Sequence, residues 1–194
     1  KAFSECNNLT SVTFSENLTK LSDYAFRYCT SLDSLVLPSR LTSIGYATFE
    51  DCDSLSFVSI PNSVTTIWHN AFSGCMSLKS VDIPKGVTTI YDGAFRNCSS
   101  LETITLPNSL TSIGENVFNG CWSLSNIYDY AVQPQDIASN TFCFYDTLHV
   151  LTGCKAAYDT LEVWNRFNII EDIAVGKVQS IKFDKDAYHC WVND

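Results

Sequence analysis

Basic residues are scarce in this chain, and their scarcity excludes one large class of partners. The sequence has 12 lysines and arginines against 21 acidic residues, which gives a formal net charge of −9. Proteins that bind the phosphate backbone of nucleic acids need clustered lysine and arginine side chains. The composition therefore predicts no binding to nucleic acid.

Long hydrophobic runs are also missing. Although 45% of the 194 residues are hydrophobic, no stretch reaches the roughly 18 consecutive apolar residues that a membrane-spanning helix requires. We therefore expect no membrane insertion by this segment. The apolar content and length suffice for one unit with a well-formed core.

Signatures of catalysis are absent as well. The three histidines, His69, His149 and His189, occupy unrelated places in the sequence. There is no H-E-x-x-H zinc motif, no G-x-S-x-G nucleophile elbow, no phosphate-binding glycine loop and no C-x-x-C pair. Because an active site needs a converging acid, base or nucleophile, we predict no enzymatic activity, no cofactor and no metal site.

What the sequence does contain is a repeat. The stretch "AFSGCMSL" at 71–78 returns as "AFRYCTSL" at 25–32, "TFEDCDSL" at 48–55, "AFRNCSSL" at 94–101 and "VFNGCWSL" at 117–124. Its cysteines follow one another at steps of 23 residues and form what we call the cysteine column: Cys6, Cys29, Cys52, Cys75, Cys98 and Cys121. A fixed period of 20–50 residues indicates a solenoid, whose coils bury their apolar faces against their neighbours.

One coil, residues 55–77, shows the expected local structure. Val58 alternates with Phe57 and Ser59, which predicts a short strand with one buried and one outward face. The following Pro-Asn pair predicts a turn, "SVTTI" a second short strand, and "HNAFSGC" one or two helical turns. Like residues of successive coils should stack, including a phenylalanine column: Phe3, Phe26, Phe49, Phe72, Phe95 and Phe118.

The role of the cysteine column has three interpretations. Nine cysteines in a secreted chain would suggest disulfides. A disulfide, however, needs Cβ atoms about 3.5–4.5 Å apart and turned toward each other, and a zinc site needs converging ligands. Stacked side chains point in parallel, which favours buried thiols that act as small hydrophobic side chains; a metal site or disulfides are the alternatives.

The consensus "LxxIxIPxxLxxIxxxAFxxCxS" resembles the BspA-like, or Treponema-type, leucine-rich repeats over residues 1 to about 130. The segment "LHVLTGCKAAYDTLEVWNRFNIIEDI" at 148–173 resembles the strand-plus-helix cap that closes such arrays. The resemblance implies an α/β leucine-rich-repeat solenoid with a parallel concave sheet, a second short strand and a short helical turn per coil. It also implies a surface protein of host-associated bacteria that adheres to host extracellular-matrix proteins or to other bacteria.

The pattern divides the chain into three parts. Residues 1–130 form the repeat array, 131–174 a degenerate last coil with the cap, and 175–194 the start of a following segment. In the cap, Ala157, Leu161 and Trp164 recur as one face of an amphipathic helix. The chain begins inside a coil, so we expect it to be part of a longer protein.

Two surfaces are candidates for binding. The first is the concave face, by which we mean the outward side chains of the first strand of each coil. Its candidate residues are Val36, Phe57, Ser59, Asp82, Thr105 and Tyr128. The second, the aromatic rim, follows the second strand and consists of Tyr24, Tyr46, Trp68 and Tyr91. Serine and threonine also suit any exposed sheet, and the rim aromatics also suit packing between coils.

The missing catalytic motifs predict a non-enzymatic module, and the resemblance implies a binding or adhesion module of an extracellular or cell-surface bacterial protein, associated with the outer membrane. Its ligand would be a protein, such as a host extracellular-matrix protein, held by the concave face. The alternative is a carbohydrate-binding or spacer domain of a larger surface protein or enzyme, with a glycan held by the aromatic rim.

Overall fold

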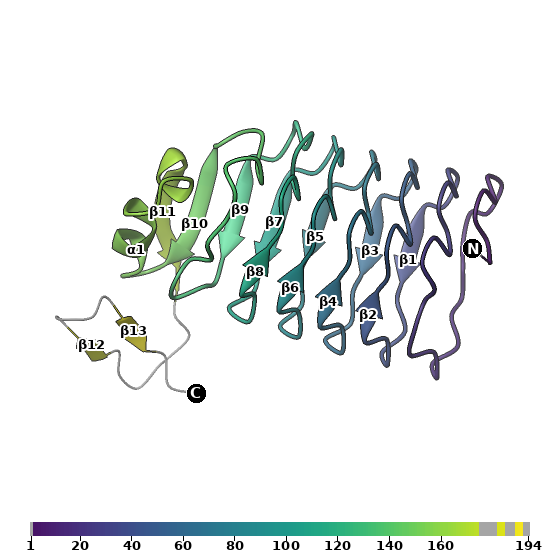
Figure 1. The fold of residues 1–194 in the computed structure, drawn as a ribbon, viewed down its shortest axis with the longest axis horizontal. Coiled ribbons are helices and arrows are strands. Elements are labelled where there is room, and N and C mark those ends of the chain that lie inside the picture. Colours follow the sequence, from purple (N-terminus) through teal and green to yellow (C-terminus); the bar gives the residue numbers. More distant parts are fainter. Residues whose placement is uncertain (1, 175–181, 185–188, 192–194) are drawn as a thin grey trace.

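The computed structural model describes residues 2–174, 182–184 and 189–191. It shows coils stacked side by side along one axis, with the N-terminus at one end of the array and helix α1 near the other (Figure 1). The coils advance by 23 residues, as the sequence predicts. Of the predicted following segment, 175–194, the structure describes only strands β12 (Lys182–Asp184) and β13 (His189–Trp191), which pair antiparallel. The rest lies outside the described residues.

The first strand of each coil lines the concave face. These strands pair in parallel in two ladders, one of β1–β3 and one in the order β11-β10-β9-β7-β5. Their bounds are β1 Ser34–Val36, β3 Phe57–Ser59, β5 Ser80–Asp82, β7 Thr103–Leu106, β9 Asn126–Asp129, β10 Thr147–Leu151 and β11 Asn168–Ile173. Their central residues are buried and the flanking ones face outward, which confirms the predicted alternation.

The second strands form a separate parallel sheet in the order β2-β4-β6-β8. They are β2 Ser43–Ile44, β4 Thr66–Ile67, β6 Thr89–Ile90 and β8 Ser112–Ile113. In each, the isoleucine is buried and the hydroxyl residue faces outward. Between the two sheets the chain turns at the proline, where the N–H of Val64 donates to the carbonyl oxygen of Pro61 at 3.1 Å.

The phenylalanine column forms the centre of the core. Adjacent rings stack with centroids 5.2 to 5.9 Å apart from Phe3 to Phe118, and Phe142 adds a further ring at 5.0 Å. Such parallel-displaced stacking adds to the free energy gained by burying the rings. Phe72 is fully buried, whereas Phe3 is 49% exposed because it has a neighbour on one side only.

The column cysteines are small buried residues that also donate hydrogen bonds. The Sγ of Cys75 lies 3.3 Å from the carbonyl oxygen of Phe49 in the preceding coil, and Cys98 makes the same contact with Phe72 at 3.2 Å. Burial raises the pKa of both thiols well above its ordinary value, so they remain protonated donors. The eight cysteines from Cys6 to Cys154 are free thiols. The prediction of burial is wrong for Cys6, which is exposed in the terminal coil.

The segment after the second strand is not helical, contrary to the prediction. Asn70 and Gly74 have φ angles of 55° and 75°, in the left-handed region. The N–H of Phe72, between them, donates to the carbonyl oxygen of Ala94 in the next coil at 2.8 Å. Because alternate N–H groups bond to the adjacent coil, they are not available for the bonds of an α-helix. The segment is therefore a series of turns hydrogen-bonded from coil to coil.

The C-terminal cap consists of β10, helix α1 (Lys155–Asp159), a 3-10 turn (Trp164–Arg166) and β11. A strand-plus-helix cap is confirmed, but the predicted helix face is wrong, because α1 ends before Leu161. The buried anchors are Tyr158, whose hydroxyl donates to the carbonyl oxygen of Ala131 at 3.1 Å, and Trp164, whose indole N–H donates to that of Gln135 at 2.7 Å. Buried tyrosine and tryptophan need such partners, and these bonds fix the path of the cap.

Candidate functional site

The N-terminal part of the concave face carries two exposed apolar side chains. Val36 on β1 is 69% exposed and Phe57 on β3 is 52% exposed. In the ladder Val36 pairs with Ser59, and Ser34 pairs with Phe57. Val36 and Phe57 are therefore diagonal neighbours on adjacent strands, a separation that a phenylalanine ring can span. Together they form a small apolar patch on a preformed sheet.

The middle of the concave face is polar and carries short side chains. Asp82 on β5 pairs with Thr105 on β7, and the hydroxyl of Thr105 donates to Asp82 Oδ1 at 2.8 Å. Thr105 in turn pairs with Tyr128 on β9. The register thus places Asp82, Thr105 and Tyr128 in one outward row.

The C-terminal end of this face holds a network around His149, which follows Tyr128 in the same row. The ring of Tyr128 stacks on the imidazole, with centroids 4.3 Å apart and an interplanar angle of 11°. His149 Nδ1 lies 2.8 and 2.9 Å from the two carboxylate oxygens of Asp172. Nε2 lies 3.1 Å from Asn126 Oδ1.

The hydrogen bonds define what this network can do chemically. Asn126 donates from Nδ2 to the hydroxyl of Ser125 at 3.1 Å, which orients its Oδ1 toward the imidazole. An amide oxygen only accepts, so Nε2 of His149 acts as a donor in this arrangement. A general base would instead need Nε2 free to accept a proton from a nucleophile. The Asp172–His149 pair therefore orients a rigid aromatic and polar surface.

His149 and Asp172 were not among the predicted site residues. The 23-residue period extends the outward row only to Tyr128, but β10 follows β9 after 21 residues, since Tyr128 pairs with His149. The available signal was local: His149 stands between Leu148 and Val150, both fully buried. That alternation indicates a histidine on the outward side of the strand. In the structure His149 shares that side with Tyr128 but is only 9% exposed, because the stacked Tyr128 ring and its hydrogen-bond partners cover it.

The aromatic rim lies away from the concave face, and its residues pack on one another. Trp68 and Tyr91 stack with centroids 4.6 Å apart and an interplanar angle of 5°. Tyr24 and Tyr46 approach to 5.2 Å in a tilted arrangement. His69 lies between the coils, 4.8 Å from Tyr91 and 6.0 Å from Tyr46. Each ring therefore has part of its surface covered by a neighbour, as expected for packing between coils.

A hollow of about 250 Å³ adjoins this rim. Its lining includes Tyr46, His69, Asp92, Arg96 and Glu115. The mixture of charges and one aromatic ring is typical of a polar surface groove.

The residues that the structure describes hold neither a metal-binding cluster nor a membrane-spanning helix. In this part of the chain no three histidine, cysteine or carboxylate side chains are grouped to hold a metal ion. No helix among the same residues is long and apolar enough to cross a membrane.

Stacked coils with a parallel strand ladder on one face and a leucine and isoleucine core define a leucine-rich-repeat solenoid. The profile of the BspA-type leucine-rich-repeat region matches in six copies, over residues 1–85 and 66–155. The chain belongs to this family. Leucine-rich-repeat proteins of this kind typically mediate protein interactions and typically are not enzymes.

Solved structures of bacterial repeat proteins share the fold. The T. pallidum leucine-rich-repeat protein is 25% identical, with a TM-score of 0.57, over 79% of this chain and 63% of that protein. A leucine-rich-repeat protein from Bacteroides ovatus is 29% identical, with a TM-score of 0.53, over 75% and 32%. The pneumococcal vaccine antigen PcpA is 23% identical, with a TM-score of 0.67, over 84% and 40%.

The chain thus spans less than two thirds of the length of each of these proteins. No curated protein matches the chain.

Proposed function

We propose that this chain is a non-enzymatic adhesion module of a bacterial surface protein, and that its concave face binds a protein partner such as a host extracellular-matrix protein. The observation that carries the proposal is the exposed apolar patch of Val36 and Phe57 on the β1–β3 ladder, where the residues paired with them are serines. Burying a phenylalanine side chain contributes about 1.5–3 kcal/mol. Serine, threonine or asparagine stands at the position of Phe57 in the other coils with a described first strand.

The rigidity of the face supports the same proposal. Its outward residues are held on parallel ladders, and Tyr128 and His149 are fixed by stacking and by the carboxylate of Asp172. A preformed surface loses little conformational entropy when a partner binds. An apolar patch at one end and the partly buried Tyr128 ring, backed by the buried His149, at the other suit an extended protein surface, since aromatic residues contribute strongly to binding energy at interfaces.

The acidic balance of the chain supports a partner recognised through apolar and polar contacts. A net charge of −9 disfavours association with anionic ligands such as nucleic acids. The engagement of both His149 nitrogens supports a binding role over a catalytic one. We place the module outside the cell, on the surface or outer membrane of a bacterium, because the family resemblance implies that location.

Substitution on the concave face tests the proposal. The probe is a set of immobilised extracellular-matrix proteins, with serum albumin as the negative control, measured by surface plasmon resonance. We expect the double variant Val36→Ser/Phe57→Ser to bind at least tenfold more weakly while its thermal stability barely changes, because both side chains are exposed. The matched control is Trp68→Ser/Tyr91→Ser on the aromatic rim.

Unchanged affinity of the concave-face variant would contradict the proposal. Loss of binding in the rim variant alone would move the site to the rim, whose exposed aromatic rings suit the alternative of a glycan ligand. Binding to no matrix protein would favour a spacer within a larger surface protein or enzyme.

A further inference from the structure

We propose a carbohydrate-binding site at the groove between Trp122 and Phe144, with a neutral saccharide as its ligand. Both residues directly follow a cysteine, Cys121 and Cys143, in the turns that lead into β9 and β10. The site borders the C-terminal end of the concave face, since Asn168 of β11 is part of its lining, and it is separate from the Val36 and Phe57 patch and from the aromatic rim. It is also independent of the protein partner proposed above.

The aromatic pair is the most exposed in the described part of the chain. Trp122 is 63% exposed and Phe144 is 51% exposed. Their centroids lie 5.3 Å apart at an interplanar angle of 67°, an edge-to-face arrangement. The two rings therefore form adjoining walls of a corner, and most of the indole surface faces solvent.

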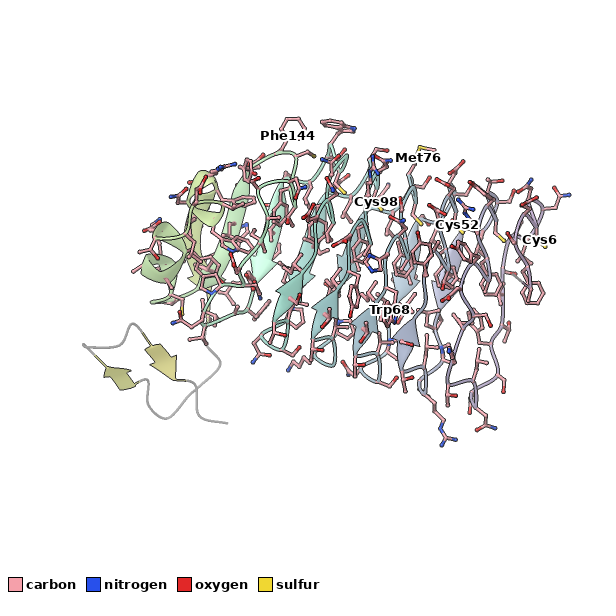
Figure 2. All side chains as sticks on the ribbon, in the orientation of Figure 1. Cys6, Cys52, Trp68, Met76, Cys98 and Phe144 are labelled. Atoms are coloured by element: carbon pink, nitrogen blue, oxygen red, sulfur yellow. The ribbon has the colours of Figure 1, made fainter. Side chains whose placement is uncertain are left out.

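Aromatic residues directly after the cysteine are exceptions in this solenoid. The two coils before Trp122 have Ser99 and Met76 at the same position. Figure 2 shows Phe144 and Met76 along one edge of the array, with Trp68 of the aromatic rim lying lower in the same view. Exposing two large aromatic side chains in adjacent turns gives no packing benefit to the core, whose ring in this region is Phe142.

Polar groups line the floor between the two rings. The groove measures about 370 Å³, and its lining includes Ser123, Ser125, Asp146 and Asn168. Asp146 accepts a hydrogen bond from the hydroxyl of Thr147 at 3.1 Å through one carboxylate oxygen. Among the described residues, the side chains of Ser123 and Asn168 form no hydrogen bond within the protein, so their donors and acceptors are available to a ligand.

This combination selects the class of ligand. A sugar ring has an apolar C–H face, which packs on an aromatic ring, and a rim of hydroxyl groups, which bond to carboxylates, amides and hydroxyls. Among the residues that the structure describes, the only charged one in the lining is the acidic Asp146, and the nearby Arg166 contacts the hydroxyl of Tyr145. The groove therefore disfavours the negative charge of a sulfated or sialylated glycan. The volume lies at the lower end of the range of about 300–1,000 Å³ for small-molecule sites, which suits a short neutral saccharide.

A glycan array carrying glucose, galactose, mannose and N-acetylhexosamine termini, with sialylated and sulfated counterparts, provides the first test. We expect binding to one or more neutral glycans and none that depends on sulfate or sialic acid. A single sugar in so open a groove should bind at roughly millimolar Kd, so the soluble ligand is titrated by saturation-transfer NMR.

Matched variants assign the binding to this groove. Trp122→Ser introduces the residue that the previous coil has at Ser99, and we expect it to weaken binding at least tenfold. Asp146→Asn keeps the acceptor that Thr147 uses, so it should fold normally and weaken binding severalfold. Trp68→Ser on the rim and Phe57→Ser on the concave face should leave glycan binding unchanged. Thermal unfolding of every variant verifies the fold.

Three results would overturn the proposal: no binding to any neutral glycan, full binding by Trp122→Ser, or loss of glycan binding in Trp68→Ser. If the wild type binds no glycan and Trp122→Ser loses binding to matrix proteins, the proposal is also overturned. The groove would then be a binding site for a protein partner. The concave-face proposal is judged separately, by Val36→Ser/Phe57→Ser on matrix proteins.

Discussion

At the scale of single residues, the phenylalanine column shows how much a position depends on its neighbours. Phe72 is fully buried and stacks on Phe49 and Phe95, while Phe3 is half-exposed and stacks on Phe26 alone. The chemistry of the side chain is the same in both places. The difference in burial arises only from the position of the coil in the array.

We therefore expect Phe72→Ala to lower the free energy of unfolding by about 3–5 kcal/mol, as for other buried aromatic residues. Phe3→Ala should cost clearly less, because much of the ring is already in contact with water. Urea denaturation followed by circular dichroism measures both. Equal losses at the two positions would contradict a linear array in which each coil is stabilised by its neighbours.

The cysteines give a second prediction at this scale. Burial raises the pKa of Cys52, Cys75 and Cys98, and the thiolate is the reactive form. Brief alkylation of the native protein at pH 8 should therefore modify Cys6, which is exposed, and leave these three intact. Mass spectrometry of peptides identifies the modified sites, and alkylation in denaturant is the control that shows all of them to be free. Protection of Cys6 in the native protein would contradict the structure of the first coil.

At the scale of elements, the repeated parts of the coil were predictable and the non-repeated parts were not. The 23-residue period fixes the two strands and the buried columns, because each coil repeats the same alternation. The period does not specify backbone conformation. Asn70 and Gly74 have positive φ angles, which asparagine and glycine adopt readily. The equivalent residues two coils earlier, Tyr24 and Tyr28, have positive φ angles as well. The residue types at these positions therefore do not reveal the backbone conformation.

The candidate site follows the same rule. The outward row to Tyr128 could be predicted, since it repeats, whereas the repeat itself predicts neither His149 nor Trp122. His149 depends on the shorter step from β9 to β10. Trp122 and Phe144 are local exceptions in a variable position, and their proximity depends on the exact path of the degenerate coil.

The junction between β9 and the cap carries a buried carboxyl group, Asp129, at the place where earlier coils have an apolar residue. Its Oδ1 accepts from the N–H of Ala131 at 3.0 Å, while Oδ2 is buried without a partner of good geometry. Burial raises its pKa to about 6, and the hydrogen bond from the N–H of Ala131 offsets part of that effect. The group is therefore neutral in the folded protein at mildly acidic pH.

This carboxyl predicts a pH dependence with a defined sign. The unfolded pKa is about 3.9, so between about pH 4 and 6 the folded protein holds a proton that the unfolded chain has released. The contribution of the protonated Asp129 to the free energy of unfolding is fully present below about pH 4 and is lost as the pH rises through about 6. It amounts to about 3 kcal/mol at most.

Asp129→Asn removes this titration and places a donor where Oδ2 has no partner. We expect it to unfold at higher denaturant concentration than the wild type at pH 7, and to lose the decline between pH 4 and 6. Urea titrations at a series of pH values measure both. Identical pH profiles of the two proteins would contradict a buried, titrating Asp129.

At the scale of the whole molecule, the solenoid is a chain of equivalent interfaces. Hydrogen bonds between coils join residues 23 apart: the hydroxyl of Thr88 donates to the carbonyl oxygen of Thr65, and that of Thr111 to Thr88. Stability in such arrays is the sum of the coils and of the interfaces between neighbours. We therefore expect the array to fold after an internal coil is removed, provided that the deletion spans one 23-residue period and keeps the remaining coils in register.

Deletion of residues 78–100, one complete coil, should leave a folded protein. It joins Ser77 to Leu101, which restores the serine-leucine pair of the repeat, and it brings Thr111 into the place of Thr88 above Thr65. We expect a native circular dichroism spectrum and one cooperative thermal transition at a lower temperature, because one coil and one interface are lost. The control variant lacks residues 78–89, which is about half a coil. Every residue after the deletion is then out of phase with the coils before it, and side chains that are buried in the wild type would face water. That variant should lose its cooperative transition, and equal damage in the two variants would contradict a fold specified by the 23-residue period.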